Sequence, residues 1–208
     1  MPHQTFFNLP KEKQQRIIDV CIDEFAEKTY HNASISNIVR QSKIAKGSFY
    51  QYFEDKKDIF KYILKYMGDK KLAYYSEIIP RINEMDFFEL LKAFYVSGVV
   101  FAKDHPKLTK IGNFVLKTDD EDLKKELMKE SGARSSDFMS MLIKGAIERG
   151  ELRSDIEIDF INHIIQSMSL STIDYYYKKH DSLGEEEKDF IHLTHQMVDC
   201  LRDGLSGQ

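Results

Sequence analysis

The sequence has few of the residues that build covalent or metal-held frameworks. It contains two cysteines, Cys21 and Cys200, in 208 residues, and no tryptophan. Two thiols cannot supply a network of disulfides or a zinc site with four cysteine ligands. Because both cysteines lie at an apolar helical spacing, we expect them to be reduced residues of a hydrophobic core.

Long hydrophobic runs are also missing. No stretch approaches the roughly 18 apolar residues that a membrane span needs, and residues 1–15 have neither a basic start nor an apolar signal core. Since 42% of the residues are hydrophobic and 31% are charged, the chain can bury a core and is not a disordered tail. We expect a cytoplasmic protein with no membrane contact.

Prolines are scarce, and no alternating strand pattern is present. The four prolines are at positions 2, 10, 80 and 106, and long amphipathic stretches lie between the last three. This pattern is typical of an all-α protein, and it predicts about nine helices. The predicted helices begin near Pro10, at 34–42, at 45–52 and near Asp55, and continue at 86–104, 107–116, 119–149, 157–180 and 183–204. Residues up to Phe7 are expected to be a disordered lead-in.

Positive charge is concentrated near the N-terminus. Although the net charge is −4, residues 1–66 hold 11 Lys and Arg against 8 Asp and Glu, whereas the remainder holds 19 against 26. A polyanion such as DNA is therefore expected to bind the N-terminal segment.

The two short helices at 34–42 and 45–52 form a helix-turn-helix pattern, in which the second helix enters the major groove of DNA. Phe49 and Phe53 lie four residues apart and are expected to pack this helix onto its neighbours. Its other face carries a cation, hydroxyls and an amide, which hydrogen-bond phosphates and base edges. The residues of that face are Lys46, Gly47, Ser48, Tyr50, Gln51 and Tyr52.

Two runs within this segment resemble the tetracycline-repressor (TetR/AcrR) family of transcription regulators. The first is Ala33-Ser34-Ile35-Ser36-Asn37-Ile38, and the second is Ala45-Lys46-Gly47-Ser48-Phe49-Tyr50-Gln51-Tyr52-Phe53, followed by Lys56. The close resemblance covers about residues 10–62. Residues 147–155 are similar to the connection that precedes the dimer-forming helices in that family.

The resemblance implies both a fold and a function. It implies a helix-turn-helix DNA-binding domain at residues 1–55 and a larger helical domain at 56–208 that binds an effector and forms a homodimer. The protein is then a repressor that binds a palindromic operator in double-stranded DNA. A small hydrophobic or amphipathic effector releases it, by tilting the helix at 56–79.

Roles for individual residues follow from the same resemblance. Lys46 and Ser48 are expected to read bases, Gly47 to allow close approach of the backbone, and Lys56 to bind a phosphate. The full set of expected DNA contacts is Ser34, Lys46, Gly47, Ser48, Tyr50, Gln51, Tyr52 and Lys56. The alternative is that Tyr50 and Tyr52 are packing residues and that Lys56 is a solvated charge.

Two positions depart from the family pattern. The family usually has glycine at the end of the first helix and at the turn between the two short helices, where this chain has Thr29 and Lys43. If either residue adopts left-handed backbone angles, its side chain costs roughly 1 to 2 kcal/mol.

The last two predicted helices carry apolar stripes at helical spacing, together with small residues that permit close helix approach. We expect them to form a four-helix interface with a second copy of the chain. The expected interface residues are Ile161, Ile165, Met168, Thr172, Tyr176, Thr194, Met197, Val198, Leu201 and Leu205. A place in the core of their own chain explains each of them equally well.

Aromatic and methionine side chains of the larger domain are candidates for an effector pocket, because they line adaptable apolar cavities. The candidates are Tyr66, Tyr74, Phe94, Phe101, Phe114, Phe138, Met141, Met168 and Tyr175. The alternative for each residue is a place in the hydrophobic core.

Signals for catalysis are weak. Asp189, His192 and His195 share one helix face, but no second ligand pair, glycine-rich phosphate loop or nucleophile motif accompanies them. We therefore expect no metal site, no cofactor and no enzymatic activity. The alternative function is a helical adaptor that binds proteins through a vestigial helix-turn-helix. The salt dependence of binding separates the two functions, because DNA binding releases counterions.

Overall fold

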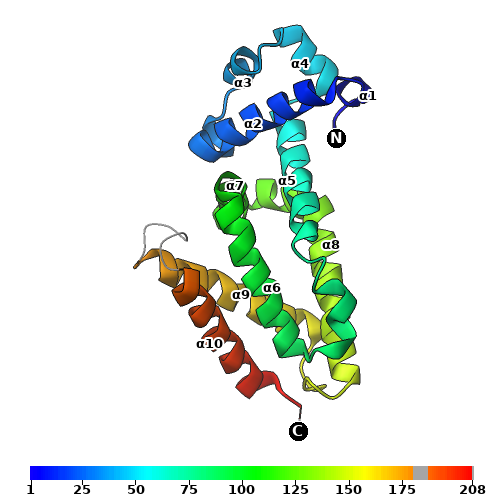
Figure 1. Cartoon of the computed structure of the whole chain (residues 1–208), viewed down its shortest axis with the longest axis vertical. Coiled ribbons are helices and arrows are strands. Elements are labelled where there is room, and N and C mark those ends of the chain that lie inside the picture. The colour runs from blue at the N-terminus through cyan, green and yellow to red at the C-terminus, as the bar shows by residue number, and fades with distance from the viewer. Residues whose placement is uncertain (180–186, 208) are drawn as a thin grey trace. The chain divides into compact units, whose positions relative to one another are not determined.

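The computed structural model describes residues 1–179 and 187–207, and for residues 128–136 and 187 only the backbone. Over these ranges the chain is built from helices (Figure 1), which confirms the all-α prediction. The elements are α1 (Gln4–Phe7), α2 (Lys11–Asn32), α3 (Ile35–Gln41), α4 (Lys46–Tyr52), α5 (Lys56–Ala73), η1 (Ile79–Glu84), α6 (Phe87–Asp104), α7 (Pro106–Lys117), α8 (Glu121–Glu148), α9 (Ile158–Tyr177) and α10 (Glu187–Leu205).

The helices α2 to α10 match the nine predicted ones, whereas α1 and η1 are additions. α1 lies in the segment predicted to be disordered, and that prediction is wrong because Phe6 is fully buried. The predicted helix toward Pro80 ends earlier, at Ala73, where bonds between residues three apart tighten the chain. The predicted start of the last helix at residue 183 lies outside the described residues.

The chain packs as two compact units. Unit 1 consists of Met1–Lys70 and His105–Ser131, and unit 2 consists of Lys71–Asp104 and Gly132–Gln208. The chain passes between the units within α5, between α6 and α7, and within α8. The expected functional division between residues 55 and 56 therefore does not coincide with the division by packing.

The core of unit 1 explains why it extends beyond the three N-terminal helices. Phe25 of α2 lies 4.8 Å from Phe60 of α5, and Phe60 lies 6.3 Å from Phe114 of α7, between ring centroids. Ile17 and Cys21 of α2 are fully buried as well. Because α2 is buried partly by α5 and α7, all these helices form one hydrophobic core.

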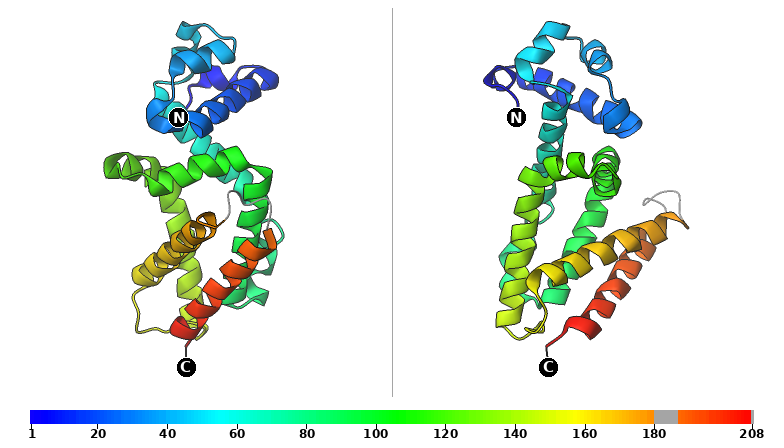
Figure 2. Two further views of the ribbon diagram at one scale, coloured as in Figure 1. Left: turned by 90° about the vertical axis from the view of Figure 1, so that its left-hand side faces the viewer. Right: turned by 180° about the vertical axis from the view of Figure 1, so that it is seen from behind.

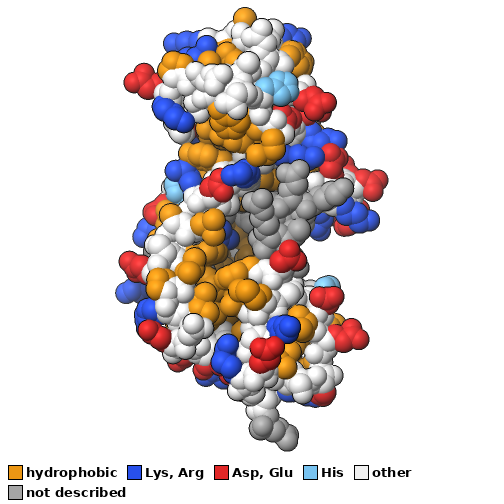
Figure 3. Space-filling view, turned by 90° about the vertical axis from the view of Figure 1, so that its right-hand side faces the viewer, with side chains coloured by type: hydrophobic (Ala, Val, Ile, Leu, Met, Phe, Trp, Pro, Cys, Tyr) orange, Lys and Arg blue, Asp and Glu red, His pale blue; other side chains and the backbone are white. Residues whose placement is uncertain are grey.

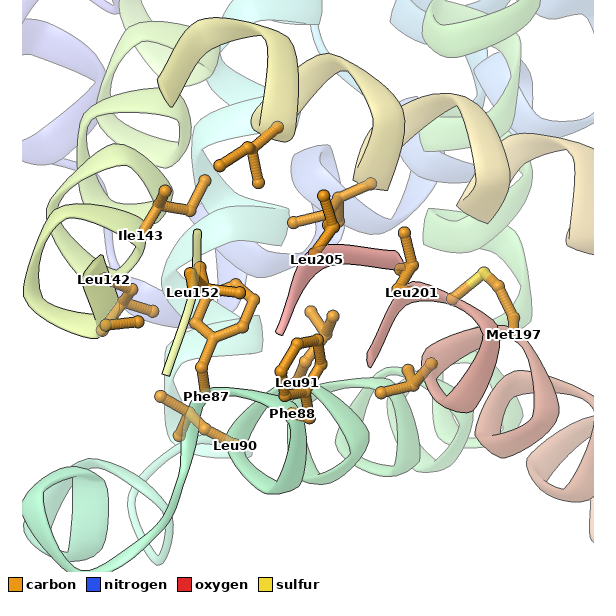
Figure 4. Close-up of a cluster of buried hydrophobic side chains, with 14 of the residues drawn as sticks. Phe87, Phe88, Leu90, Leu91, Leu142, Ile143, Leu152, Met197, Leu201 and Leu205 are labelled. Carbon is orange, nitrogen blue, oxygen red and sulfur yellow. The ribbon is translucent and has the colours of Figure 1, made fainter. Parts of the chain in front are cut away.

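The core of unit 2 is formed by α6, α8, α9 and α10. Phe88 and Leu91 of α6 lie close to Leu201 of α10 in this cluster (Figure 4), and Ile143 of α8 and Ile161 of α9 complete it without solvent exposure. α9 and α10 pack side by side (Figure 2). The burial of this apolar surface is what holds the four helices together.

Two expectations about composition have different outcomes. Cys21 is a buried free thiol as expected, but Cys200 is exposed on α10, so its placement in the core is wrong. The apolar spacing misled here because Cys200 lies one residue before the buried Leu201. Among the described residues, no helix combines the length and the hydropathy needed to cross a membrane.

Candidate DNA interface

The helix-turn-helix consists of α3, a four-residue connection at 42–45 and α4. The Ile44 amide donates to the Val39 carbonyl at 3.2 Å and the Lys43 amide donates to the Arg40 carbonyl at 3.3 Å. This is a Schellman motif, which requires a left-handed residue directly after the helix cap. Lys43 occupies that position with φ of 54°. The departure from glycine noted in the sequence therefore falls on a left-handed backbone position.

The second departure lies at the end of α2. Thr29 has φ of 59° and ψ of 172°, a region that glycine adopts almost alone. The chain thus bends sharply at Thr29 and makes one more helical turn before α3. The Ala33 amide donates to the Thr29 carbonyl at 3.1 Å and closes this turn.

Lys56 secures the same turn from the first residue of α5. Its Nζ donates to the carbonyls of His31 at 3.0 Å and Ala33 at 3.1 Å, and lies 4.8 Å from the Tyr30 ring centroid. Partial burial lowers the pKa of this ammonium. Two of its three N–H donors are thus bound to backbone carbonyls, so Lys56 stabilises this turn, and its expected phosphate contact stays a prediction.

Glu24 is a residue of the site that the sequence analysis missed. This carboxylate is almost fully buried, and it accepts from the Ser34 amide at 2.8 Å and from the Asn37 side-chain amide. It thereby satisfies an orphan donor at the start of α3. The Ser34 hydroxyl, the expected cap, makes no capping bond and stays exposed. The sequence does not predict this contact, because Glu24 lies ten residues before Ser34 and capping patterns involve residues only three or four apart.

The exposed face of α4 matches most of the expected DNA contacts. Lys46, Gly47 and Gln51 are exposed, Tyr50 is 47% exposed, and Ser48 is half-buried. A side chain at Gly47 would meet no atom within 4 Å, so the surface around it is open. On the opposite face, Phe49 and Phe53 are fully buried, as their spacing predicts.

Tyr52 is the exception among the expected contacts of α4. It is only 6% exposed, and its ring packs 6.3 Å from Phe6 and 6.4 Å from Phe53. Packing therefore accounts for the Tyr52 ring. A phosphate contact of its hydroxyl stays a prediction.

Three effector candidates come together in unit 2. Phe94 of α6 and Phe138 of α8 lie 6.0 Å apart between ring centroids, and Met168 of α9 packs partly buried against the same core. Tyr75 lies 4.9 Å from Phe94 and extends this group, although the sequence analysis left it out. We call Tyr75, Phe94, Phe138 and Met168 the unit 2 aromatic cluster.

The other effector candidates are dispersed. Tyr66 and Phe114 belong to unit 1, where Phe114 packs on His31 and Phe60. Tyr74 lies 5.4 Å from the buried Phe101 in unit 2, and Met141 points outward with 59% exposure. Tyr175 lines a small cleft of about 180 Å³ at the ends of α9 and α10, together with Asp189 and His192.

The expected dimer residues face the core of their own chain. Ile161, Ile165, Tyr176, Thr194, Met197, Val198, Leu201 and Leu205 are all buried within the single chain, and Met168 and Thr172 are half-buried. The eight buried residues offer no surface to a second copy, whereas the half-buried Met168 and Thr172 keep some, so a place for these two in an interface stays a prediction. The core alternative explains the eight, because α9 and α10 must first cover α6 and each other.

Comparisons with known proteins agree with this geometry. Residues 17–63 match the sequence model of the bacterial regulatory proteins of the tetR family. The chain is 22% identical over 206 residues to the fatty acid metabolism regulator protein of Bacillus subtilis, covering 94% of this chain and 96% of that protein.

Solved structures show the same architecture. A TetR family transcriptional regulator from Chloroflexus aurantiacus is 27% identical and aligns over 100% of both chains with a TM-score of 0.71. The Bacillus subtilis regulator FadR in complex with stearoyl-CoA is 19% identical, with 91% and 98% of the chains covered and a TM-score of 0.70. The chain is thus similar over its whole length to TetR family transcription regulators, and the match to the family's own sequence model falls on residues 17–63, which include the helix-turn-helix.

Proposed function

We propose that this protein is a repressor that binds a palindromic operator as a homodimer and leaves it when an acyl-CoA binds to unit 2. One observation carries the DNA-binding part of the proposal. The seven-residue helix α4 buries Phe49 completely and turns Lys46, Tyr50 and Gln51 to solvent. Such a protein acts where the bacterial chromosome lies, in the cytoplasm.

The polar face of α4 supports separate roles in DNA binding. Lys46 and Gln51 carry the donors that read guanine and adenine edges in the major groove. Tyr50 offers a hydroxyl to a phosphate, and Lys43 adds an exposed cation at the turn before α4. Lys43 was absent from the expected contacts because the sequence analysis treated it only as a misplaced glycine.

A selection from randomised and genomic DNA fragments at two salt concentrations tests this assignment. We expect a salt-sensitive palindrome whose half-sites lie one helical turn, about 34 Å, or a multiple of it apart. Lys46→Ala should change the preferred bases, whereas Tyr50→Phe should weaken binding to all sequences alike. A folded, dimeric protein that enriches no sequence would support the adaptor function instead.

The homodimer requires faces of α9 and α10 that their own chain leaves open. On α9, Phe160, His163, Ser167 and Ser171 recur at three- and four-residue spacing and are all exposed. The exposed residues His192, Gln196 and Cys200 follow the same spacing on α10. We name these seven residues the open face. The two serines allow close helix approach, and Phe160 offers apolar area with 55% of its surface exposed.

Sedimentation equilibrium at micromolar concentration tests the open face. Ser167→Glu places a charge at its centre and should shift the dimer to monomer by at least tenfold in the dissociation constant, roughly the effect of an unpaired buried charge. Ser169→Ala is the matched control, because Ser169 faces Tyr95 inside unit 2. A Ser167→Glu protein that stays as dimeric as the wild type would place the dimer contact elsewhere.

Two findings support an acyl-CoA effector. A similar Bacillus subtilis protein is named as a fatty acid metabolism regulator, and the similar Bacillus subtilis regulator FadR was solved with stearoyl-CoA. In this chain, the unit 2 aromatic cluster provides partly buried apolar side chains from three helices. Hydrophobic side chains also gather on the face of the chain drawn in Figure 3, and apolar side chains of this kind suit an acyl chain.

Operator binding in the presence of stearoyl-CoA, stearate or free CoA tests the effector class. We expect stearoyl-CoA to release the operator and free CoA to have no effect, because CoA lacks the apolar chain. Phe94→Ala should weaken the response by roughly tenfold. Met141→Ala, at the exposed methionine of α8, is the control and should respond like the wild type. A response to none of the three compounds would refute this effector class.

A further inference from the structure

The recognition helix is too short to hold its own orientation. α4 has seven residues, no side-chain cap at its N-terminus and four C-terminal carbonyls that its own turns cannot satisfy. Helices of this length are not stable alone. The angle at which α4 presents Lys46 and Tyr50 is therefore set by the segments that contact it, among them α3 and α1.

The segment at residues 3–6 completes the C-terminal end of α4. The His3 amide donates to the Tyr52 carbonyl at 2.8 Å, and the Thr5 hydroxyl donates to the Gln51 carbonyl. The His3 ring Nδ1 lies 3.3 Å from the same Gln51 oxygen. Two carbonyls that water would otherwise solvate are thereby bound to a separate part of the chain.

Phe6 joins this polar contact to the hydrophobic core. Its side chain is fully buried, with its ring centroid 4.9 Å from Phe53 after α4 and 5.5 Å from Tyr62 of α5. The segment is itself anchored to α2, because the buried Gln14 donates to the carbonyls of Phe7 at 3.1 Å and Leu9 at 2.7 Å. α1 therefore connects the end of α4 to both α2 and α5.

We infer that His3, Thr5 and Phe6 are positioning residues for operator recognition, which hold α4 at the angle that its base-reading side chains need. This inference rests on the proposed use of α4 as the helix that reads the operator. Base contacts demand alignment of the whole helix, whereas binding to unrelated DNA depends mainly on positive charge. Loss of the contacts that His3, Thr5 and Phe6 make should therefore weaken binding to the operator more than binding to unrelated DNA.

The test compares affinity for the selected operator with affinity for unrelated DNA at one salt concentration. Thr5→Val keeps the shape of an exposed side chain but removes its hydroxyl, and should weaken operator binding by roughly threefold to tenfold, the equivalent of one hydrogen bond. Binding to unrelated DNA should change by less than about twofold. Thr5→Ser keeps the donor and should restore the wild-type ratio.

Phe6 supplies a second variant with its own control. Phe6→Ala should lower the operator affinity by at least about tenfold at a temperature where circular dichroism shows it folded. Phe7→Ala truncates the exposed neighbour and should leave the affinity ratio unchanged. Equal losses on operator and unrelated DNA, or none in Thr5→Val, would overturn the inference. A wild-type protein without any operator would instead refute the proposed function.

Discussion

Two non-glycine residues in unit 1 hold backbone angles that favour glycine. Lys43 is left-handed in the Schellman motif after α3, and Thr29 lies in a region that is still less accessible to a β-branched side chain. Strain of this kind costs of order 1 to 3 kcal/mol per residue and is retained where surrounding contacts determine the turn. Here Lys56 and the capping bonds of α3 supply those contacts.

The first prediction concerns substitutions that remove this backbone strain. Thr29→Gly and Lys43→Gly should each stabilise the protein by about 1 kcal/mol, because relief of the backbone strain exceeds the added entropy of glycine in the unfolded chain. Urea unfolding at neutral pH measures the change. Gln15→Gly is the control, since Gln15 is exposed in the regular part of α2 before the bend, and its replacement should destabilise by about 1 kcal/mol. A destabilised Lys43→Gly would show that the lysine side chain itself stabilises the turn.

The second prediction concerns the buried thiol. Cys21 is inaccessible, and burial, with a smaller contribution from the nearby Glu24 charge, raises its pKa far above the ordinary value. Since the thiolate is the reactive form, Cys21 should be inert in the folded protein. In a Cys200→Ser variant, we expect no reaction with an aromatic disulfide reagent until urea unfolds the chain, and then one thiol per chain. Reaction under native conditions would contradict the packing of α2.

At the scale of elements, ion pairs tie α5 to the start of α8. Glu126 accepts from Lys57 at 2.7 Å and from Lys61 at 2.9 Å, and these bonds lower the pKa of its carboxyl. The ionised form is therefore favoured in the folded protein. Its stabilising contribution is present above the unfolded pKa and is lost as the pH falls through the folded pKa.

The third prediction follows from that direction. Thermal unfolding measures the effect. The wild type should unfold at a higher temperature than Glu126→Gln, and this difference should be largest near neutral pH and disappear as the pH falls below about 4. High salt should narrow it, because all three groups contact solvent. Glu121→Gln, whose carboxylate lies 3.9 Å from Lys124, should show a much smaller difference. A difference that is independent of pH would exclude the ion pairs as its cause.

A second Schellman motif ends α8, this time with glycine at the left-handed position. Gly150 has φ of 76°, its amide donates to the Ile147 carbonyl at 3.0 Å, and the Glu151 amide donates to the Ala146 carbonyl at 2.9 Å. The predicted helix at 119–149 ends directly before this glycine, as the motif requires, whereas Lys43 holds the same left-handed position without a glycine.

The fourth prediction uses Gly150 as the counterpart of Lys43. Gly150→Ala should destabilise unit 2 by about 1 kcal/mol, because the new Cβ must adopt the left-handed conformation. Free space around the position excludes a clash as the cause, since an added Cβ meets no atom within 4 Å. Thermal unfolding measures the loss. An unchanged midpoint would mean that the turn relaxes to another conformation.

At the scale of the whole molecule, regulation must cross the three chain connections between the units. One of them leads from α6, which carries Phe94, directly into α7. α7 packs on α2 within unit 1, where Lys107 donates to Asp23 at 2.7 Å and Phe114 contacts Phe60. Movement of α6 by an effector therefore has a covalent route to the helices that hold α4.

The fifth prediction treats this route as a coupling between two sites. The effector and the operator should weaken each other's binding by the same factor, as linkage requires. Lys107→Ala removes the ion pair with Asp23 and should bring this coupling factor closer to one. The affinity for the operator in the absence of effector should hardly change, because the ion pair is exposed. Lys110→Ala, on the exposed side of α7, is the control. Titrations of each ligand with and without the other measure the factor.

The sequence by itself determined the helices α2 to α10, the helix-turn-helix and the two positions of backbone strain, but not α1 or η1. These features depend on local spacing, on residues three or four apart and on known turn chemistry. It also determined that α9 and α10 each have an apolar stripe. It did not determine whether that stripe faces a second copy or the same chain, since periodicity defines a face but not what covers it.

Only the tertiary structure decided the features that join distant residues. Glu24 accepts from the amide at the start of α3, Lys56 donates to carbonyls at the end of α2, and Phe6 packs on Phe53 after α4; each contacts a partner at least ten residues away. The same packing buries Tyr52, which the sequence assigned to DNA. The free energy of these contacts comes from burial and from pairing of orphan backbone groups, which are properties of the assembled fold and not of the local sequence.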